Sequence, residues 1–268
     1  MEKQINFGGF IECSFNDWPE RLCCVAFVNG CNLRCRFCHN PTLIKQNDKC
    51  ITEDEILSKI AKLSGKLDNM CLTGGEPLIY GSETVRAFCK KVKKLNPDIK
   101  IKLDTNGTLP KELDNVLYDK INKKKRYGVE TYEIVKTGLV DYVAVDFKAG
   151  SCTEYDKLVM CENRKELCFN SLPFTVTQSL FSLLKSDIPF EIRTTLIEGF
   201  HKEEDLDFMY KLISQTLLNK KENVICYIQK YRPDVTLDAD KNWKTPSDEF
   251  VERIKNIGEK RGLKIKIR

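Results

Sequence analysis

Short apolar runs alternate with longer amphipathic stretches along most of the 268-residue chain. The apolar runs are rich in β-forming residues and predict strands at Leu22–Val28, Met70–Leu72, Ile99–Leu103, Tyr142–Val145, Phe190–Leu196 and Val224–Ile228. Apolar residues recur at helical spacing elsewhere, which predicts helices after Thr52 and over Glu83–Leu95, Lys111–Ile121, Val176–Leu184, Glu203–Leu217 and Ser247–Gly258. Because strands alternate with helices, we expect parallel strands, and six such units suit an α/β fold of the partial (β/α)6 barrel type.

The length suits one large domain or two small ones, and the continuous alternation without a low-complexity linker leads us to predict a single domain over residues 1–268. Its core is expected at about 20–233, followed by a C-terminal extension of one helix and one strand over 234–268. The first predicted helix has a clear start, because Thr52-x-x-Glu55 is a capping-box pattern that precedes Ile56 and Ile60.

Polar or glycine-rich segments follow the predicted strands at once. They are Asn29-Gly30-Cys31, Thr73-Gly74-Gly75-Glu76-Pro77, Asp104-Thr105-Asn106-Gly107, Asp146-Phe147-Lys148 and Gln229-Lys230-Tyr231-Arg232-Pro233. Arg193 lies inside the fifth run, where a charge is costly unless it is paired, so it marks either the site or a structural salt bridge. The carboxyl ends of barrel strands form the active face, so we expect these residues to converge on one mouth.

Three cysteines follow the first strand, as Cys31-x-x-x-Cys35-x-x-Cys38. Cysteine thiolates hold iron–sulfur clusters, normally four for a cubane, so three would leave one iron free for a substrate. The alternative is a zinc site in which His39 completes a Cys₃His set. Of the other ten cysteines, Cys24, Cys71 and Cys226 fall in apolar runs and are expected in the core.

Composition limits the partners and the location. The net charge of +5 is mild, and the basic run Lys123–Arg126 is short enough to be a solvated helix end, so nucleic acid is not an expected partner. No apolar stretch is long enough to cross a bilayer, and Met1–Phe10 has no apolar core of a signal peptide, so we expect a cytosolic protein without a membrane partner. Thirteen cysteines in a reducing compartment favour metal or catalysis over disulfides.

The cysteine spacing, with Phe37 before the last cysteine, resembles the signature of the radical S-adenosylmethionine superfamily. The run Cys38-His39-Asn40-Pro41 is similar to the activating enzymes of glycyl-radical proteins, namely pyruvate formate-lyase activase and the anaerobic ribonucleotide reductase activating protein. Further runs resemble the longer form of the second kind; they are Gly8-Gly9-Phe10, Arg193-Thr194-Thr195 and Gln229-x-Tyr231-Arg232-Pro233.

The resemblance implies a [4Fe-4S] cluster on Cys31, Cys35 and Cys38, with S-adenosylmethionine bound at the open iron. It implies that the cofactor is bound by Asn40, Gly74, Gly75, Glu76, Asp104, Asn106, Lys148 and Arg193. It also implies a monovalent cation beside the cofactor carboxylate, held by Asp104, Thr105 and Asp146. His201 receives no role and is expected at a loop surface.

These observations lead to the hypothesis of an activase that installs a glycyl radical on a partner enzyme, the anaerobic ribonucleotide reductase, with flavodoxin or ferredoxin as reductant. One alternative is a radical enzyme that acts on a small molecule, such as one in deazapurine biosynthesis. The other is a zinc-stabilised binding module without catalysis, which would leave the segments that contain Gly74, Asp104 and Asp146 unexplained.

Overall fold

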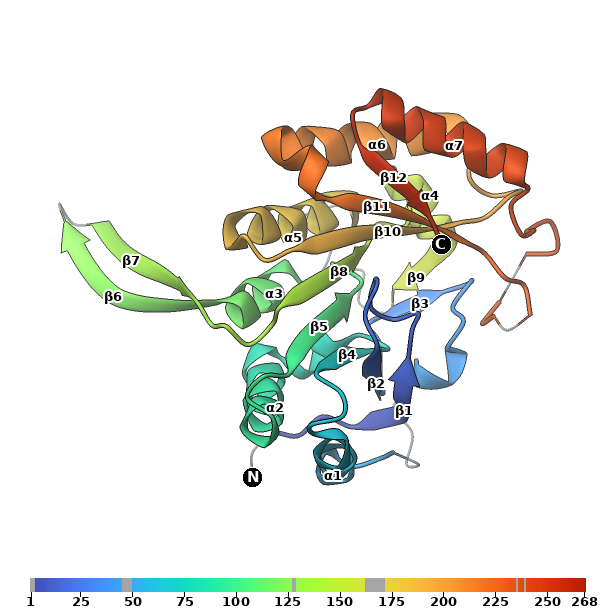
Figure 1. Ribbon diagram of the computed structural model, residues 1–268. Coiled ribbons are helices and arrows are strands. Elements are labelled where there is room, and N and C mark those ends of the chain that lie inside the picture. The colour runs from blue at the N-terminus through green and yellow to red at the C-terminus, as the bar shows by residue number, and fades with distance from the viewer. Residues whose placement is uncertain (1–2, 45–49, 127–128, 162–171, 235, 239) are drawn as a thin grey trace.

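The computed structural model describes residues 3–44, 50–126, 129–161, 172–234, 236–238 and 240–268. Within these residues eight strands form one curved sheet in the order β1-β2-β4-β5-β8-β10-β11-β12 (Figure 1). All of the expected strands are present, and they run parallel in sequence order: β2 (Cys23–Val28), β4 (Asn69–Gly74), β5 (Lys100–Thr105), β8 (Tyr142–Asp146), β10 (Phe190–Leu196) and β11 (Ile225–Lys230). The predicted partial barrel of parallel strands is confirmed.

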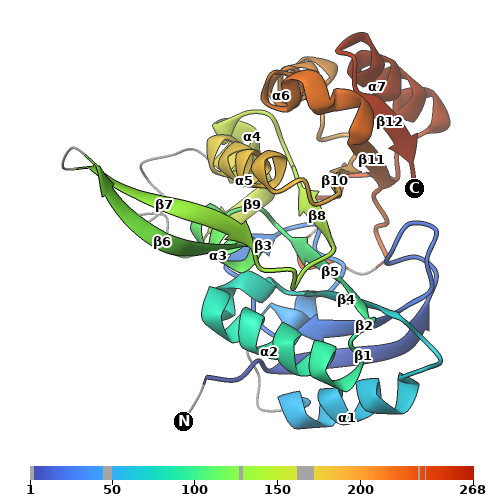
Figure 2. The same ribbon diagram turned by 60° about the vertical axis from the view of Figure 1, so that its left-hand side comes forward.

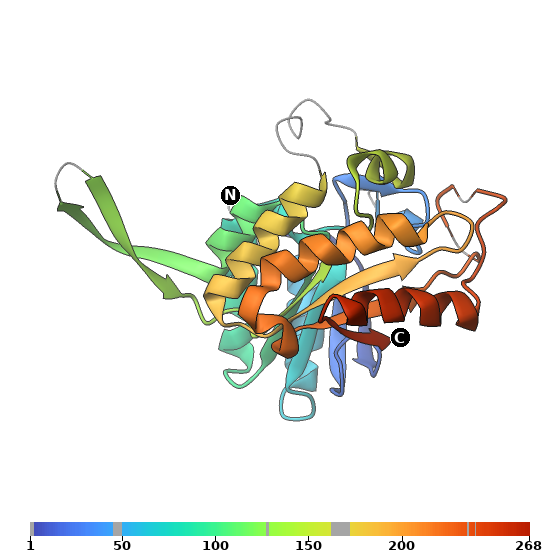
Figure 3. The ribbon, with the colours of Figure 1, turned by 90° about the horizontal axis from the view of Figure 1, so that it is seen from above.

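Helices cover the outer face of the sheet, and helices that follow neighbouring strands pack against each other (Figure 3). They are α1 (Glu53–Leu63), α2 (Ser82–Leu95), α3 (Pro110–Leu117), α5 (Leu172–Ser186), α6 (Glu203–Leu217) and α7 (Asp248–Lys260). The capping box at Thr52 is confirmed, because its hydroxyl accepts from the Glu55 N–H while the Glu55 carboxylate accepts from the Thr52 N–H. Ser247 caps α7 in the same position.

The two faces of the sheet bury different kinds of side chain. Outward-facing residues such as Leu72, Leu103 and Val145 join the main hydrophobic core under the helices. The inner face carries a small cluster around Trp18 and Cys71. The strands predicted from apolar runs therefore place most of their apolar side chains against the helices. Their inner face can hold polar side chains.

Two strands extend the sheet beyond the predicted six. β1 (Phe7–Ser14) pairs antiparallel with β2 at one edge, and β12 (Lys264–Ile267) pairs parallel with β11 at the other. The C-terminal helix and strand therefore continue the same sheet, and the main core cluster runs from Ile5 to Ile265. None of the helices in the described part of the chain has the length and apolar character that a membrane crossing requires.

The helix predicted over Lys111–Ile121 is wrong in its second half. Helix α3 ends at Leu117, and Tyr118 begins β6 (Tyr118–Arg126), which pairs antiparallel with β7 (Val129–Lys136). Figures 1 and 2 show this hairpin projecting away from the body of the protein. Cross-strand pairing is a contact between distant residues, which a local helical pattern does not reveal. The basic run Lys123–Arg126 therefore lies in a strand and not at a helix end, and its side chains lie outside the described residues.

A second small sheet holds the cysteine segment. β3 (Leu33–Cys35) pairs antiparallel with β9 (Val159–Cys161), which directly follows the short helix α4 (Cys152–Leu158). The Arg36 N–H also donates to the Leu158 carbonyl at 3.0 Å. The segment between the first and last of the three cysteines is thus anchored to the chain that follows β8.

Glu76 joins the carboxyl end of β4 to that of β5. It is fully buried, and its carboxylate accepts from the Asn106 N–H at 2.6 Å and from the Thr105 hydroxyl at 2.9 Å. The Leu78 N–H donates to the same carboxylate at 3.1 Å. Burial raises the pKa of Glu76 from 4.5 to about 7, although these three donors act in the opposite direction.

This raised pKa predicts a pH-dependent stability. The folded protein holds the Glu76 proton more tightly than the unfolded chain, so the contribution is complete below pH 4.5 and is lost as pH rises through about 7. At 1.36 kcal/mol per pKa unit, the loss is at most about 3 kcal/mol. Urea unfolding at pH 5 and pH 8.5 should show a larger fall in the free energy of unfolding for the wild type than for Glu76→Gln. The same fall in both proteins would contradict the assignment.

Candidate active site

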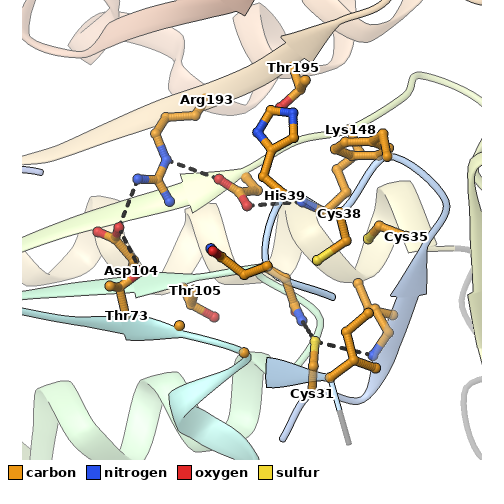
Figure 4. Close-up of a pocket in the computed structure, with 18 of the residues that line it drawn as sticks. Cys31, Cys35, Cys38, His39, Thr73, Asp104, Thr105, Lys148, Arg193 and Thr195 are labelled. Atoms are coloured by element: carbon orange, nitrogen blue, oxygen red, sulfur yellow. Dashed lines mark hydrogen bonds and ion pairs between the residues drawn. The ribbon is translucent and has the colours of Figure 1, made fainter. Parts of the chain in front are cut away.

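A cavity of about 260 Å³ opens at the carboxyl ends of the parallel strands. All of the site residues predicted from the sequence except Glu76 line it: Cys31, Cys35, Cys38, Asn40, Gly74, Gly75, Asp104, Thr105, Asn106, Asp146, Lys148 and Arg193. Figure 4 shows side chains from the cysteine segment and from several strands pointing into this one space. The convergence expected from strand order is therefore present.

The three cysteines lie on one wall of the cavity. The Leu33 N–H donates to the Cys31 sulfur at 3.4 Å, and the Cys38 N–H donates to the Cys35 carbonyl at 3.0 Å. Burial raises the pKa of the thiol to about 12 at Cys31 and about 11 at Cys35. Burial also raises the pKa of Cys38, and the hydrogen bond from the Asn40 N–H only partly offsets this increase. Metal ligation requires thiolates, so loading these cysteines would release protons.

The chemistry of this wall fits an iron–sulfur cluster, whose ligands are cysteine thiolates. Three thiols face one shared cavity, which is the donor set of a cluster with one open iron. His39 also lines the cavity, with its Nε2 3.1 Å from the Arg232 carbonyl and its ring stacked on Tyr231.

A buried carboxylate, Asp104, and a half-buried one, Asp146, line the cavity together with their cations. Asp146 holds the Lys148 ammonium at 2.9 Å and the Arg193 Nε at 3.0 Å. The other end of the Arg193 guanidinium reaches Asp104 at 2.8 Å (Figure 4). The Thr73 hydroxyl donates to the same oxygen of Asp104 at 3.1 Å. Arg193 thus lies between two carboxylates contributed by β5 and β8.

Mutual attraction keeps these groups charged in spite of their burial. Desolvation alone would raise the pKa of Asp104 and Asp146, but the neighbouring cations hold both below the usual range. Desolvation would likewise lower the pKa of Lys148, yet Asp146 raises it above its ordinary value. The Lys148 ammonium also lies 5.5 Å from the centre of the Phe37 ring. The cavity therefore presents cations and anions in fixed positions.

The paired glycines after β4 permit a close approach of two backbones. A Cβ on Gly75 would lie 1.9 Å from the Gly30 carbonyl oxygen. Gly74 has a φ of 116°, a conformation that favours glycine, and a Cβ there would meet the Val28 backbone at 2.5 Å. The glycines let the segment after β4 lie against the end of β2, just below the first cysteine.

Asn106 links the strand end to the cysteine segment. Its amide donates to the Asn32 side chain at 2.9 Å and lies 4.0 Å from the Cys31 sulfur. Thr105 also faces the cavity, but its hydroxyl donates to Glu76. Glu76 itself lies beneath the cavity wall, where it orients these two residues and has no surface in the cavity.

Sequence reasoning missed three polar residues near this site. Lys102 and Glu191 are buried on the inner face of β5 and β10, and Asp17 lines the cavity from the segment between β1 and β2. The signal for the first two was the one that identified Arg193, a charge inside an apolar run. The surface position expected for His201 is wrong, because the ring is buried and its Nε2 lies 3.0 Å from the Lys148 carbonyl.

Known proteins that resemble this chain include activating enzymes. One, from Methanocaldococcus jannaschii and provisionally named as a glycyl-radical enzyme activating enzyme, is 25% identical over 94% of this chain and 91% of its own length. The pyruvate formate-lyase 1-activating enzyme of Escherichia coli K12 is 23% identical, with 96% of each chain covered. A GTP 3',8-cyclase of Clostridium perfringens is 27% identical over 69% of this chain and 49% of its own length.

A solved structure shares the fold of this chain, and the sequence pattern assigns its family. The structure of a radical SAM methyltransferase from Sphaerobacter thermophilus superimposes with a TM-score of 0.63 at 15% identity, covering 96% of this chain and 68% of that one, which shows a shared fold. The sequence pattern of the radical SAM superfamily matches residues 25–209, from β2 into α6. This span includes the three cysteines, the paired glycines and the ion pairs of the cavity, and the chain belongs to the radical SAM superfamily.

Proposed function

We propose that this enzyme installs a glycyl radical on a partner protein, the anaerobic ribonucleotide reductase. The observation that carries the proposal is the extent of the similarity to activating enzymes. It covers 94% of this chain and 91% of the Methanocaldococcus jannaschii protein, whereas the match to the cyclase covers only 49% of the cyclase. The run Cys38-His39-Asn40-Pro41 supports the same assignment.

Membership in the superfamily implies a [4Fe-4S] cluster and S-adenosylmethionine. When bound, the cluster supplies the electron that cleaves S-adenosylmethionine and generates the radical that abstracts hydrogen from the target. We assign Cys31, Cys35 and Cys38 to the cluster. Arg193 and Lys148 are assigned to the cofactor carboxylate, because both are cationic and both line the cavity.

Neutral and carboxylate groups complete the proposed cofactor site. Gly74 and Gly75 offer backbone groups to the methionyl part, and Asn40 and Asn106 offer side-chain amides. Asp104 orients Arg193 by its ion pair. Glu76 is assigned a positioning role, because it contacts Asn106 and has no surface in the cavity.

The remaining partners are proposed from the chemistry that the reaction needs. A low-potential electron has to reach the cluster, so we propose flavodoxin or ferredoxin as the reductant. A cytosolic location suits both of these partners. The similarity to a GTP 3',8-cyclase favours a small-molecule substrate as the second candidate. The two candidates differ in whether the radical is transferred to a protein.

The cluster assignment predicts a specific effect of cysteine substitution. After anaerobic reconstitution the wild type should bind about four irons per chain and absorb broadly in the visible range. Cys31→Ala, Cys35→Ala and Cys38→Ala should each lose the cluster. The matched control is Cys152→Ala, because Cys152 is exposed and does not line the cavity. Zinc in place of iron in the wild type, or equal iron loss in the control, would contradict the assignment.

The activase proposal predicts a radical on the partner. Reduced enzyme, S-adenosylmethionine and the anaerobic reductase of the same cell should give a glycyl radical doublet by electron paramagnetic resonance. A reductase with its target glycine changed to alanine should give no doublet, and neither should Cys35→Ala enzyme. If methionine and 5′-deoxyadenosine form but no doublet appears, the activase proposal fails and the small-molecule candidate takes its place.

A further inference from the structure

Lys102 places an ammonium group in the interior of the partial barrel, directly below the proposed cofactor site. The side chain is fully buried on the inner face of β5. Its Nζ lies 2.6 Å from an Asp104 oxygen, 2.7 Å from the Asp17 carbonyl oxygen and 3.6 Å from a Glu191 oxygen. A carboxylate, a backbone carbonyl and a second carboxylate are the oxygen ligands that hard metal cations take in proteins.

The Asp104 carboxylate is therefore occupied on both sides. Lys102 holds Oδ1, while Arg193 and Thr73 hold Oδ2. The resemblance to activating enzymes implied a monovalent cation on Asp104, but here a cation that belongs to the chain already holds one of its oxygens. Burial alone would lower the pKa of Lys102, and the attraction of Asp104 instead raises it, so the ammonium stays charged.

The surrounding charges support this arrangement. Glu191 is fully buried, accepts from the Tyr142 hydroxyl at 3.1 Å and lies 3.7 Å from Arg268. Lys102 is thus the cation shared by the two buried carboxylates of β5 and β10. Through the Asp17 carbonyl it also fixes the segment that joins β1 to β2, where Asp17 lines the cavity.

We propose that Lys102 is the built-in cation of this site, so that S-adenosylmethionine binding does not require added sodium or potassium. The inference rests on the proposed role of Asp104 and Arg193 in cofactor binding. Lys102 does not line the cavity, so it is a positioning residue: it neutralises Asp104 and holds that carboxylate in place for Arg193. The positive charge of the Lys102 ammonium is then present whatever the salt composition of the solution.

The test compares potassium chloride with choline chloride at equal ionic strength, which keeps general screening constant. Equilibrium S-adenosylmethionine binding to the cluster-loaded wild type should change less than about twofold between the salts, because Lys102 already fills the oxygen cage. Choline is the reference cation, since it is too large to enter a cage of this kind. Lys102→Ala should bind about tenfold or more weakly in choline chloride, since removing one partner of a buried ion pair is costly. Potassium should restore part of that loss by entering the vacated oxygen cage.

A second readout uses cluster-free protein. Potassium should raise the melting temperature of Lys102→Ala relative to choline and should leave the wild type unchanged. The matched control is Lys100→Ala on the same strand, because Lys100 is exposed and pairs at 3.4 Å with Asp141 outside the cavity. Lys102→Met, which keeps the side-chain volume without the charge, replaces Lys102→Ala if the alanine variant does not fold.

Two results would overturn the proposal. One is a wild-type affinity for S-adenosylmethionine that is higher in potassium chloride than in choline chloride. This result contradicts the proposal whatever the Lys102 variants show. The other is a Lys102 variant with wild-type affinity in both salts. Neither measurement uses a partner protein, so a missing glycyl radical would remove the activase proposal and leave this inference standing.

Discussion

Two carboxylates, the buried Asp104 and the half-buried Asp146, are the constraint on which the interior of this barrel depends. An isolated charge in this environment is costly, so each carboxylate is held between two cations. The resulting chain of alternating charge links three strands: Lys102 and Asp104 on β5, Asp146 at the end of β8, and Arg193 on β10. It fixes the relative positions of the groups that we propose to bind the cofactor, and the cysteines line the same cavity.

The sequence predicted the parallel strands and the converging strand ends because both follow from local patterns. Alternation of apolar runs with amphipathic stretches gave the order of β2, β4, β5, β8, β10 and β11. A polar residue that directly follows a strand of a parallel sheet lies at the carboxyl edge of that sheet, together with the residues that follow the other strands. Arg193 was recognised because a charge in an apolar run demands a partner, and Lys102 satisfies the same criterion at the centre of Ile101-Lys102-Leu103.

What the sequence did not predict depends on contacts between distant residues. The pairing of β6 with β7 turned the end of a predicted helix into a strand, and the β3–β9 pairing joins residues more than a hundred positions apart. His201 was misplaced for the same reason, since its ring is buried against residues distant in the chain and contacts the Lys148 carbonyl, 53 positions away. Glu76 does not line the cavity, and its position is explained by three hydrogen-bond donors that lie after β4 and around the end of β5.

The central claim is that the ion-pair chain, together with the cysteines, forms the cofactor site, and Asp146→Asn tests it most directly. Asp141→Asn is the matched control, because Asp141 also pairs with a lysine, Lys93 at 3.0 Å, but lies just before the opposite end of β8. Equilibrium binding of S-adenosylmethionine to the cluster-loaded proteins should fall about tenfold or more in Asp146→Asn, which releases Arg193 and Lys148, and should change little in Asp141→Asn. Wild-type affinity in Asp146→Asn would contradict the account.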